Sequence, residues 1–524
     1  MSAAQVKEPA ISEGNIFQRF GRGFVNFFAH GIPNFFTKTI PGFFKKLGLG
    51  IGHGVVNFGK RFARGSIGTK ISHVICGFGN LYRGQFIKGL LYLLLEVGYI
   101  LYMVMCPVVV GPNKFKIPMG WKSLANLQLS SGKVYASKAN AGLVSAKVLP
   151  KGVSQLFLLF GLVTIALTII MIIVWNSSIK SSVAADTAVK EGRKPSSFKE
   201  DLQSLMDNKF HLTMLTPTIL AATIFTILPT IFMICMAFTT YNDNDMVSAG
   251  KNIFNWNGVN NFGYMFSGQT SLGAEIKARF FPVLGWTLIW AVFATFTCYF
   301  GGILLAILIN KKGLKGKKIF RVCFILTIAI PQFISLLAMR NLLSELGPVN
   351  SLLKSWGWID QSISFLGTNT TGNNPILAKV MVIIINMWLG IPYTMLMTSG
   401  ILMNIPADLY EAARVDGTSK AKMFFKITLP YVIFITTPYL IGSFVGNINS
   451  FNTIFLLTGG GPSVGAYKAG ETDLLVTWLY KLTIESGDYN TGAVIGILTF
   501  LITATITLVT YRRSKAYNEE DTFQ

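Results

Sequence analysis

The sequence NIPADLYEAARVDGTSKAKMFFKITLP occupies residues 404–430, directly after a long apolar run. Pro406 fixes a backbone angle that suits the first turn of a helix, and the carboxylate of Glu411 is expected near the positive end of that helix. Gly417 permits a sharp turn, because glycine adopts backbone angles that other residues avoid. A second amphipathic piece follows and is predicted to stop at Pro430. The pattern predicts a cytoplasmic helix–turn–helix with its own charged surface.

The composition excludes an ordinary soluble enzyme. Of the 524 residues, 51% are hydrophobic and 13% are charged, whereas soluble domains carry about 25% charged residues. The bilayer is therefore the expected solvent. The net charge is +23, which we attribute to cytoplasmic loops that face anionic lipid and not to nucleic-acid binding.

Eight apolar runs reach the roughly 20 residues that a spanning helix needs. The predicted fold class is therefore an all-α membrane protein with eight transmembrane helices. Pro229, Pro331 and Pro392 lie inside three of the runs and are expected to bend them. The runs cover residues 86–110, 153–175, 212–239, 281–310, 319–339, 376–402, 431–457 and 491–511.

Positive charge in the short loops predicts a plasma-membrane protein with both termini in the cytoplasm. Lysine and arginine are concentrated in residues 311–318, 420–426 and 512–515, which share one side in this topology. Residues 111–152 disagree, because they hold seven lysines and no acidic residue, yet they fall outside. A re-entrant or interfacial loop is the alternative for that segment.

Residues 1–85 form a basic tail, and residues 14–65 within it are rich in Phe, Gly and basic residues. This pattern is typical of short amphipathic helices on an anionic leaflet, with membrane lipids as partners. A disordered basic tail is the alternative. Gly54, Gly59 and Lys60 match part of a P-loop, but the next residue is not the Ser or Thr that binds magnesium. We therefore expect no nucleotide site in this chain.

Catalytic residues and metal ligands are not apparent in the sequence. The cysteines form no CxxC pair and the histidines form no HExxH pattern. Glu96 is the clearest carboxylate within a span. We interpret it as a protonated or hydrogen-bonded helix contact, with a proton or ion site as the alternative. A membrane-bound transferase, which needs catalytic acids or metal ligands at the membrane edge, is the less favoured alternative function.

The 404–430 segment resembles the EAA signature of permease subunits of bacterial ABC importers. The match consists of EAA at 411–413, Gly417 and IxLP at 427–430. In that family the loop carries a coupling helix that docks into a cleft on the ATPase subunit. The resemblance implies that ATP and magnesium bind to partner ATPase subunits and that this chain holds no cofactor. The implied ATPase-coupling residues are Glu411, Ala412, Ala413, Asp416 and Gly417.

The later half of the chain is similar to the MalF-like permeases of maltose and maltodextrin importers. The similarity includes NMWLGIPY at 386–393, SFVGNIN at 443–449 and LTGGGP at 457–462. The loop at 240–280 is far shorter than the external domain of the Gram-negative protein, which implies a Gram-positive source with a lipid-anchored binding protein. The implied domains are a cytoplasmic tail (1–85), two extra helices (86–210), an ABC type I importer core of six helices (211–511) and a cytoplasmic tail (512–524).

In MalF-like proteins the sugar is held halfway across the membrane by residues of the later core spans. Amide and hydroxyl groups suit sugar hydroxyls, an aromatic face suits a pyranose ring, and Gly390 is expected to let the backbone approach the ligand. Asn and Ser that hold helices together are the alternative. Gly446 stands where the family has an aromatic residue, which leaves the exact sugar open. The matching positions are Asn386, Leu389, Gly390, Tyr393, Ser443 and Asn447, with Ser335 a weaker match.

The resemblance implies a permease subunit, not an enzyme, that imports maltose or maltodextrin-type oligosaccharides by alternating access. The implied partners are a second, MalG-like permease, two ABC ATPase subunits and an extracellular sugar-binding protein. The same fold importing a galacto-oligosaccharide or a raffinose-type sugar is the alternative.

Overall fold

A computed structural model describes residues 40–105, 108–110, 115–117, 119–127, 153–241, 255–268, 271–311, 313–367, 374–463 and 469–513. Predictions about residues 14–39, most of the loop at 111–152 and residues 514–524 lie outside this set. Two short strands, β1 (Val108–Val110) and β2 (Phe115–Ile117), pair antiparallel. Every other regular element of the described residues is a helix, and the predicted all-α class is confirmed.

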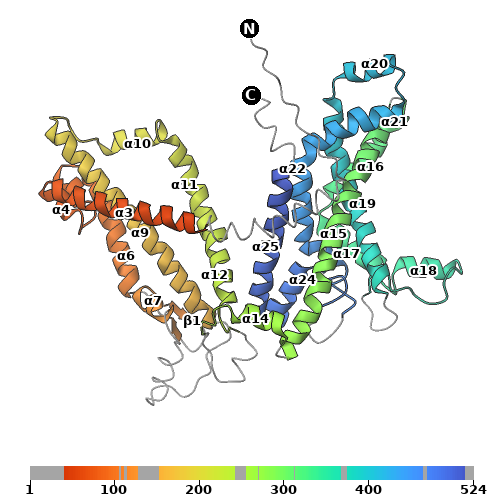
Figure 1. The fold of residues 1–524 in the computed structure, drawn as a ribbon, viewed down its shortest axis with the longest axis horizontal. Helices are drawn as coiled ribbons and strands as arrows, with labels where there is room; N and C mark the ends of the chain where they lie inside the picture. Colours follow the sequence, from red (N-terminus) through yellow and green to blue (C-terminus); the bar gives the residue numbers. More distant parts are fainter. Residues whose placement is uncertain are drawn as a thin grey trace, which may run out of the picture. The chain divides into compact units, whose positions relative to one another are not determined.

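Seven of the described helices are long and apolar enough to cross a membrane, or up to eight if a bent helix pair is one span (Figure 1). The predicted number of spans therefore agrees with the structure when the bent pair is counted. The spans are α6 (Phe86–Met105), α9 (Val153–Lys190), α11 to α12 (Phe210–Ala222, η3 Thr223–Ile227, Leu228–Ala237), α15 (Ser271–Asn310), the bent pair α16 (Lys317–Ala329) and α17 (Gln332–Leu342), α19 (Pro375–Met403), α21 to α22 (Lys420–Met423, η4 Phe424–Thr428, Leu429–Ile448) and α25 (Tyr489–Arg513).

The chain divides into two compact units, residues 1–125 with 159–228 and residues 126–158 with 229–524. The division falls inside the third span, so α11 groups with the N-terminal helices. The sequence places the boundary at residue 210, before this span. The remaining helices are α3 (Ile40–Arg64), α4 (Ile67–Ile71), α5 (Phe78–Tyr82), α7 (Trp121–Leu127), α10 (Phe198–Met206), α14 (Asn260–Ser267), α18 (Pro348–Ser355), α20 (Ala407–Val415), α23 (Phe451–Leu457), α24 (Leu475–Tyr480) and η5 (Lys481–Glu485).

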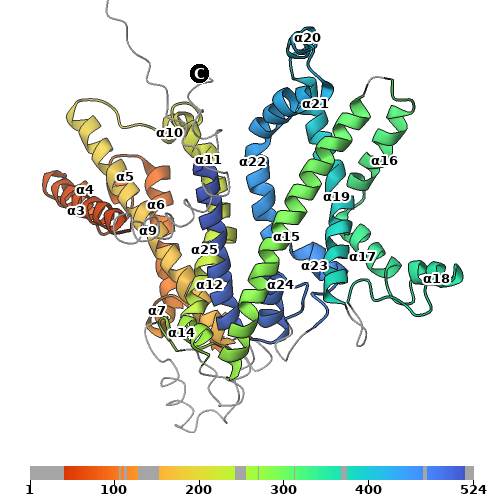
Figure 2. The same cartoon turned by 45° about the vertical axis from the view of Figure 1, so that its right-hand side comes forward.

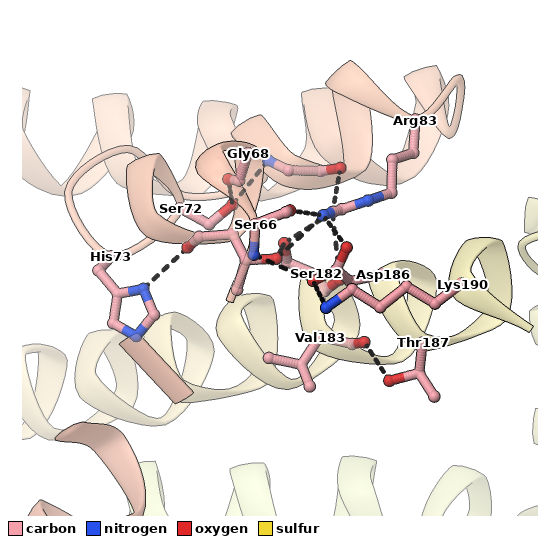
Figure 3. A network of polar contacts seen from close by, with 12 residues as sticks. Ser66, Gly68, Ser72, His73, Arg83, Ser182, Val183, Asp186, Thr187 and Lys190 are labelled. Atoms are coloured by element: carbon pink, nitrogen blue, oxygen red, sulfur yellow. Dashed lines mark hydrogen bonds and ion pairs between the residues drawn. The ribbon is translucent and has the colours of Figure 1, made fainter. Parts of the chain in front are cut away.

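In the first unit, α9 continues for four turns beyond its apolar run, and α4 and α5 pack against this polar extension. Arg83 forms an ion pair with Asp186 at 3.0 Å, and both side chains are nearly buried. The same guanidinium donates to the hydroxyls of Ser66 and Ser182 (Figure 3). It also donates to the Thr69 hydroxyl. The sequence interpretation treats residues 1–85 as a surface tail, whereas Ser66 to Arg83 fold onto α9. A buried charge is tolerated here because it is both paired and hydrogen-bonded.

Glu96 on α6 makes a local contact. Its Oε2 accepts a hydrogen bond of 2.8 Å from the backbone N–H of Cys76. This agrees with the interpretation of Glu96 as a hydrogen-bonded contact that ties the segment before α5 to the first span.

The fifth span is not the single helix predicted for residues 319–339. The axes of α16 and α17 differ by 95°. Ile330 is extended, with φ of −79° and ψ of 127°, because a residue before proline avoids the helical region. Pro331 therefore does more than bend the span: α16, at about 20 Å, is too short to cross a hydrocarbon core alone.

The seventh predicted run, 431–457, also contains two helices. α22 ends at Ile448, and α23 begins at Phe451. Between them the amide of Asn449 donates to the carbonyl of Val445, and the Ser450 hydroxyl bonds to Thr453. Polar side chains that bond to nearby groups compete with the helix, which explains the break.

Two other prolines are accommodated by π-helical turns. η3 comes two residues before Pro229, and η4 comes two residues before Pro430. A proline ring crowds the carbonyl of the preceding turn, and a π turn is a wider turn that occurs within α-helices. The helices therefore continue through both prolines. Pro392 also lies within an unbroken helix, α19.

The second unit is organised around α15, which lies between α22 and α19 (Figure 2). Its core contains Trp290 of α15, Leu336 of α17, Val382 of α19 and Ile454 of α23, all fully buried. The helix–turn–helix projects beyond the ends of α19 and α22 (Figure 1). The rigid core therefore fixes the base of that element.

Candidate coupling loop and translocation face

The helix–turn–helix predicted from residues 404–430 is present. α20 begins directly after Pro406 and ends in a left-handed glycine, Gly417, with φ of 67°. The N–H of Thr418 donates to the carbonyl of Ala413 at 2.9 Å, and the N–H of Gly417 donates to Arg414 at 3.0 Å. This pair of bonds is a Schellman motif, which closes the helix with a glycine in the left-handed region.

The base of this element is tied to the core. The Tyr410 hydroxyl of α20 bonds to the Thr428 hydroxyl of η4 at 2.8 Å. Phe424 and Leu429 pack against a buried cluster that contains Tyr299 of α15. The predicted stop at Pro430 is wrong, because α21, η4 and α22 form one continuous helical run. The second arm of the element is therefore continuous with a membrane-spanning helix.

The tip of the element is exposed and both apolar and charged. Val415, directly before the turn, is 89% exposed, and Phe425 of η4, nearer the base, is 62% exposed. Glu411 and Asp416 are also exposed, and neither forms an ion pair with another described residue. Glu411 is the fifth residue of α20 and lies past the first turn, where the sequence analysis expected it. Ala412 is exposed beside it, and Ala413 is half-buried.

Three of the four predicted sugar residues of α19 face other parts of this chain. Asn386 is buried, and its amide donates to the sulfur of Cys298 on α15 at 3.4 Å. A Cβ atom at Gly390 would lie 2.6 Å from the same sulfur. The close approach that Gly390 permits within this chain is therefore to α15, and its expected approach to a ligand stays a prediction. Leu389 packs against the buried core of the unit.

Asn447 of α22 also faces α15. Its side-chain amide donates to the Thr295 hydroxyl at 2.9 Å, and its backbone carbonyl accepts a hydrogen bond from the Trp290 ring nitrogen at 3.1 Å. Thr295 and Cys298 are one turn apart on α15, so the two asparagines hold three helices together. Ser335 is buried in α17, while Ser443 of α22 is half-buried.

Tyr393 differs from the other predicted residues because its side chain is 53% exposed. It stacks on Tyr439 of α22, with ring centroids 6.2 Å apart and planes 27° apart. Tyr439 lies midway along α22, and Ser443 follows one turn later on the same face. The sequence analysis missed Tyr439, although its place ahead of Ser443 at helical spacing signals it. The exposed positions Gly442 and Gly446 have no atom near a built Cβ, so this side of α22 is open.

Comparisons with known proteins agree on one family. Residues 299–516 match the family described as "Binding-protein-dependent transport system inner membrane component". The galactooligosaccharides transport system permease protein GanP of Bacillus subtilis is 30% identical over 449 residues, which cover 85% of this chain and 97% of GanP. The chain belongs to this permease family.

Other permeases of this family are similar. The maltodextrin transport system permease protein MalC of Streptococcus pneumoniae is 29% identical over 457 residues, 86% of this chain and 96% of MalC. The maltose/maltodextrin transport system permease protein MalF of Salmonella typhimurium is 38% identical over 264 residues, 49% of each chain. A solved bacterial alginate ABC transporter matches with a TM-score of 0.46 and 25% identity, over 60% of this chain and 96% of the solved one.

The relatives are permease subunits, so the prediction of a MalF-like permease subunit is confirmed and that of a transferase is not. In the part of the permease that the structure describes, three or more His, Cys, Asp or Glu side chains nowhere form a group that could hold a metal ion.

A buried charge pair at the other end of the permease unit was missed. Lys481 and Asp473 form an ion pair at 2.6 Å with both side chains buried. Asp473 also accepts hydrogen bonds from the Gly470 N–H and the Thr477 hydroxyl. Burial raises the pKa of Asp473, and Lys481 opposes that rise. The pair fixes the loop after the LTGGGP stretch. Asp473, Thr477 and Lys481 follow one another at four-residue helical spacing, which is the signal that the sequence analysis overlooked.

Proposed function

We propose that this permease forms one half of the membrane pathway of an ATP-driven importer of maltodextrin-type oligosaccharides. The observation that carries the proposal is the projecting α20–Gly417–α21 element in a chain of this family. A bare surface loop needs neither the Schellman closure nor the exposed Val415 and Phe425. Exposed apolar side chains beside charged ones are typical of a protein-binding surface.

The proposed partner at this surface is an ATPase subunit, which binds ATP and magnesium in place of this chain. Val415 and Phe425 supply apolar area, while Glu411 and Asp416 supply charge for orientation. Because α21 runs into α22 without a break, closure of the ATPases would shift α22. That shift opens the pathway to one side of the membrane and then the other. The proposed complex also contains a second permease and an extracellular, lipid-anchored binding protein, with the coupling element in the cytoplasm.

The proposed sugar contact is the stacked pair Tyr393 and Tyr439. Both rings lie near the middle of spanning helices, and one of them is exposed. Aromatic faces with a few hydroxyl groups suit a neutral carbohydrate. Ser443 adds a hydroxyl one turn away. We assign Asn386, Leu389, Gly390, Asn447 and Ser335 to supporting this face, since their described contacts are with protein.

A second candidate cargo is a galacto-oligosaccharide. The relative GanP, named for that sugar class, is as similar to this chain as the maltodextrin permeases are. The open positions Gly442 and Gly446 leave room for either class beside the tyrosine pair.

The test is ATP-dependent uptake by the assembled complex in proteoliposomes. Labelled maltotriose competes against unlabelled maltodextrin or galacto-oligosaccharide. We expect Tyr393→Ala to raise the half-saturating sugar concentration by roughly two- to tenfold, since an aromatic contact contributes about 0.5–1.5 kcal/mol. Tyr393→Phe should retain most uptake. Phe296→Ala removes an aromatic of α15 that is 42% exposed and serves as the control. Unchanged uptake by Tyr393→Ala at all concentrations would remove the pair from the sugar pathway.

A further inference from the structure

Helix α3 is a basic amphipathic helix outside the proposed coupling and sugar surfaces. Its 25 residues include no acidic residue and five cations, Lys45, Lys46, Lys60, Arg61 and Arg64. Val55, Phe58 and Phe62 follow helical spacing and define one stripe. Lys46, Lys60 and Arg64 lie on the opposite face by the same spacing. Segregation of this kind is typical of helices that lie in a membrane interface.

The C-terminal end of α3 is anchored to the rest of the first unit. The Phe58 ring lies 4.7 Å from the His73 ring and 5.1 Å from the Trp175 ring, measured between centroids. Arg61 donates to the side-chain carbonyl of Asn176 at 3.1 Å. Phe58 is accordingly half-buried.

These anchors lie where α9 changes from apolar to polar. Residues 153–175 of α9 extend about 33 Å, the thickness of a hydrocarbon core, and Asn176 begins the polar extension. Tryptophan is enriched at membrane interfaces, so Trp175 marks that level. The contacts therefore hold the end of α3 at the membrane–water boundary of α9.

The platform beneath the anchor is rigid. His73 follows α4, and α4 is held to α9 through the Arg83–Asp186 pair and the Thr69–Ser182 hydrogen bond (Figure 3). A short connection between Arg64 and Ile67 joins α3 to this platform. The platform restricts the orientations that α3 can adopt relative to α9.

Beyond the anchor, the part of the apolar stripe whose side chains the structure describes is only partly covered by protein. On this stripe Val55 is 64% exposed, and Phe62 is 47% exposed although its ring lies 5.3 Å from the His73 ring. Val56 and Leu49 are exposed as well, but helical spacing places them nearer the cations. The cations Lys46, Lys60 and Arg64 are exposed as well. An apolar strip beside a surplus of positive charge complements acyl chains below anionic headgroups.

We propose that α3 lies in the interface of a leaflet rich in anionic phospholipid, with Val55 toward the acyl chains and its cations among the headgroups. The N-terminal unit thereby binds lipid, a role that does not depend on the sugar or on ATP. Each cation near an anionic surface contributes about fivefold to binding. Loss of three cations should lower the membrane-bound fraction of the helix about a hundredfold in its bound-to-free ratio.

The test places an environment-sensitive fluorophore on Val55→Cys in the full chain, with the five native cysteines replaced by alanine. The protein is reconstituted in nanodiscs of phosphatidylcholine alone or with phosphatidylglycerol. Blue-shifted emission, quenched by spin-labelled lipid, reports burial in the leaflet. The charge variant is Lys46→Gln/Lys60→Gln/Arg64→Gln. Lys311→Gln/Lys315→Gln/Lys318→Gln removes the same charge from the loop between α15 and α16 and from the first turn of α16, and it is the matched control.

We expect lipid quenching in phosphatidylglycerol that is lost in the charge variant and retained in the control. Three results would overturn the proposal. One is water-like emission in anionic nanodiscs, and another is equal quenching in the charge variant. The third is blue-shifted emission without lipid quenching, which would place α3 against protein instead.

Discussion

A graded series at Gly417 tests the coupling element most finely. At φ of 67° a residue with a side chain is strained, although a Cβ there meets no atom within 4 Å. The cost of Gly417→Ala is therefore conformational, about 1–2 kcal/mol. Gly417→Asn should cost less, because Asn tolerates this region. Gly417→Pro should cost most, because its φ is fixed at a negative value and it loses the hydrogen bond to Arg414.

The assay is copurification of the ATPase subunits, followed by sugar-stimulated ATP hydrolysis. We expect both to decrease in the order Gly, Asn, Ala, Pro, at equal membrane levels of the permease. Gly357→Ala is the matched control, because Gly357 has φ of 69° and open space but lies in the turn after α18. Full ATPase association in Gly417→Pro would refute the reasoning. An equal defect in Gly357→Ala would show that strain anywhere has this effect.

Other substitutions give distinct outcomes. Glu411→Lys reverses the charge at the proposed ATPase surface, and like charges across an interface can cost several kcal/mol. We expect this variant to lose ATPase binding in a pull-down. Wild-type binding would remove Glu411 from the interface. Asp473→Asn should lower the free energy of unfolding by about 3–5 kcal/mol, since it removes one partner of a buried ion pair. Thermal unfolding measures this, and the double variant with Lys481→Met should recover much of the loss. Gly390→Ala should loosen α15 from α19 and lower thermal stability, because the new Cβ would lie 2.6 Å from the Cys298 sulfur. Adding Cys298→Ala should restore stability. If Gly390 instead contacts the sugar, Gly390→Ala should lower sugar affinity, and Cys298→Ala should not restore it.

Local sequence signals located the elements that obey local rules. Gly417 marked its turn correctly, because only a left-handed residue closes α20 in this way. Long apolar runs located the spans, since burial in lipid needs little besides length and hydropathy. Pro331 was expected to bend its span, yet the 95° break was larger than a bend. The prediction that the helix stops at Pro430 was wrong because a π turn accommodates the proline. The sequence patterns that we used do not predict π turns.

Side-chain partners were harder to predict, because they depend on which helices meet. Asn386 and Asn447 carry groups that suit a sugar, but both bond to α15. A single sequence cannot distinguish helix contacts from pathway contacts for such residues. Arg83 and Asp186 are separated by about a hundred residues, so their pairing follows only from the fold. Tyr393 stays a predicted sugar contact, and the stacking of its ring on Tyr439 follows only from the fold.

Density for the cargo inside the assembled transporter is the most direct test of the central claim. The complex of this permease, a second permease, two ATPases and the sugar-binding protein should be imaged by electron cryomicroscopy with maltodextrin. We predict an elongated sugar density at mid-membrane, against the Tyr393 and Tyr439 rings, with α20 seated on an ATPase subunit. Sugar bound in the pathway away from this chain, or an α20 that contacts no ATPase, would contradict the account.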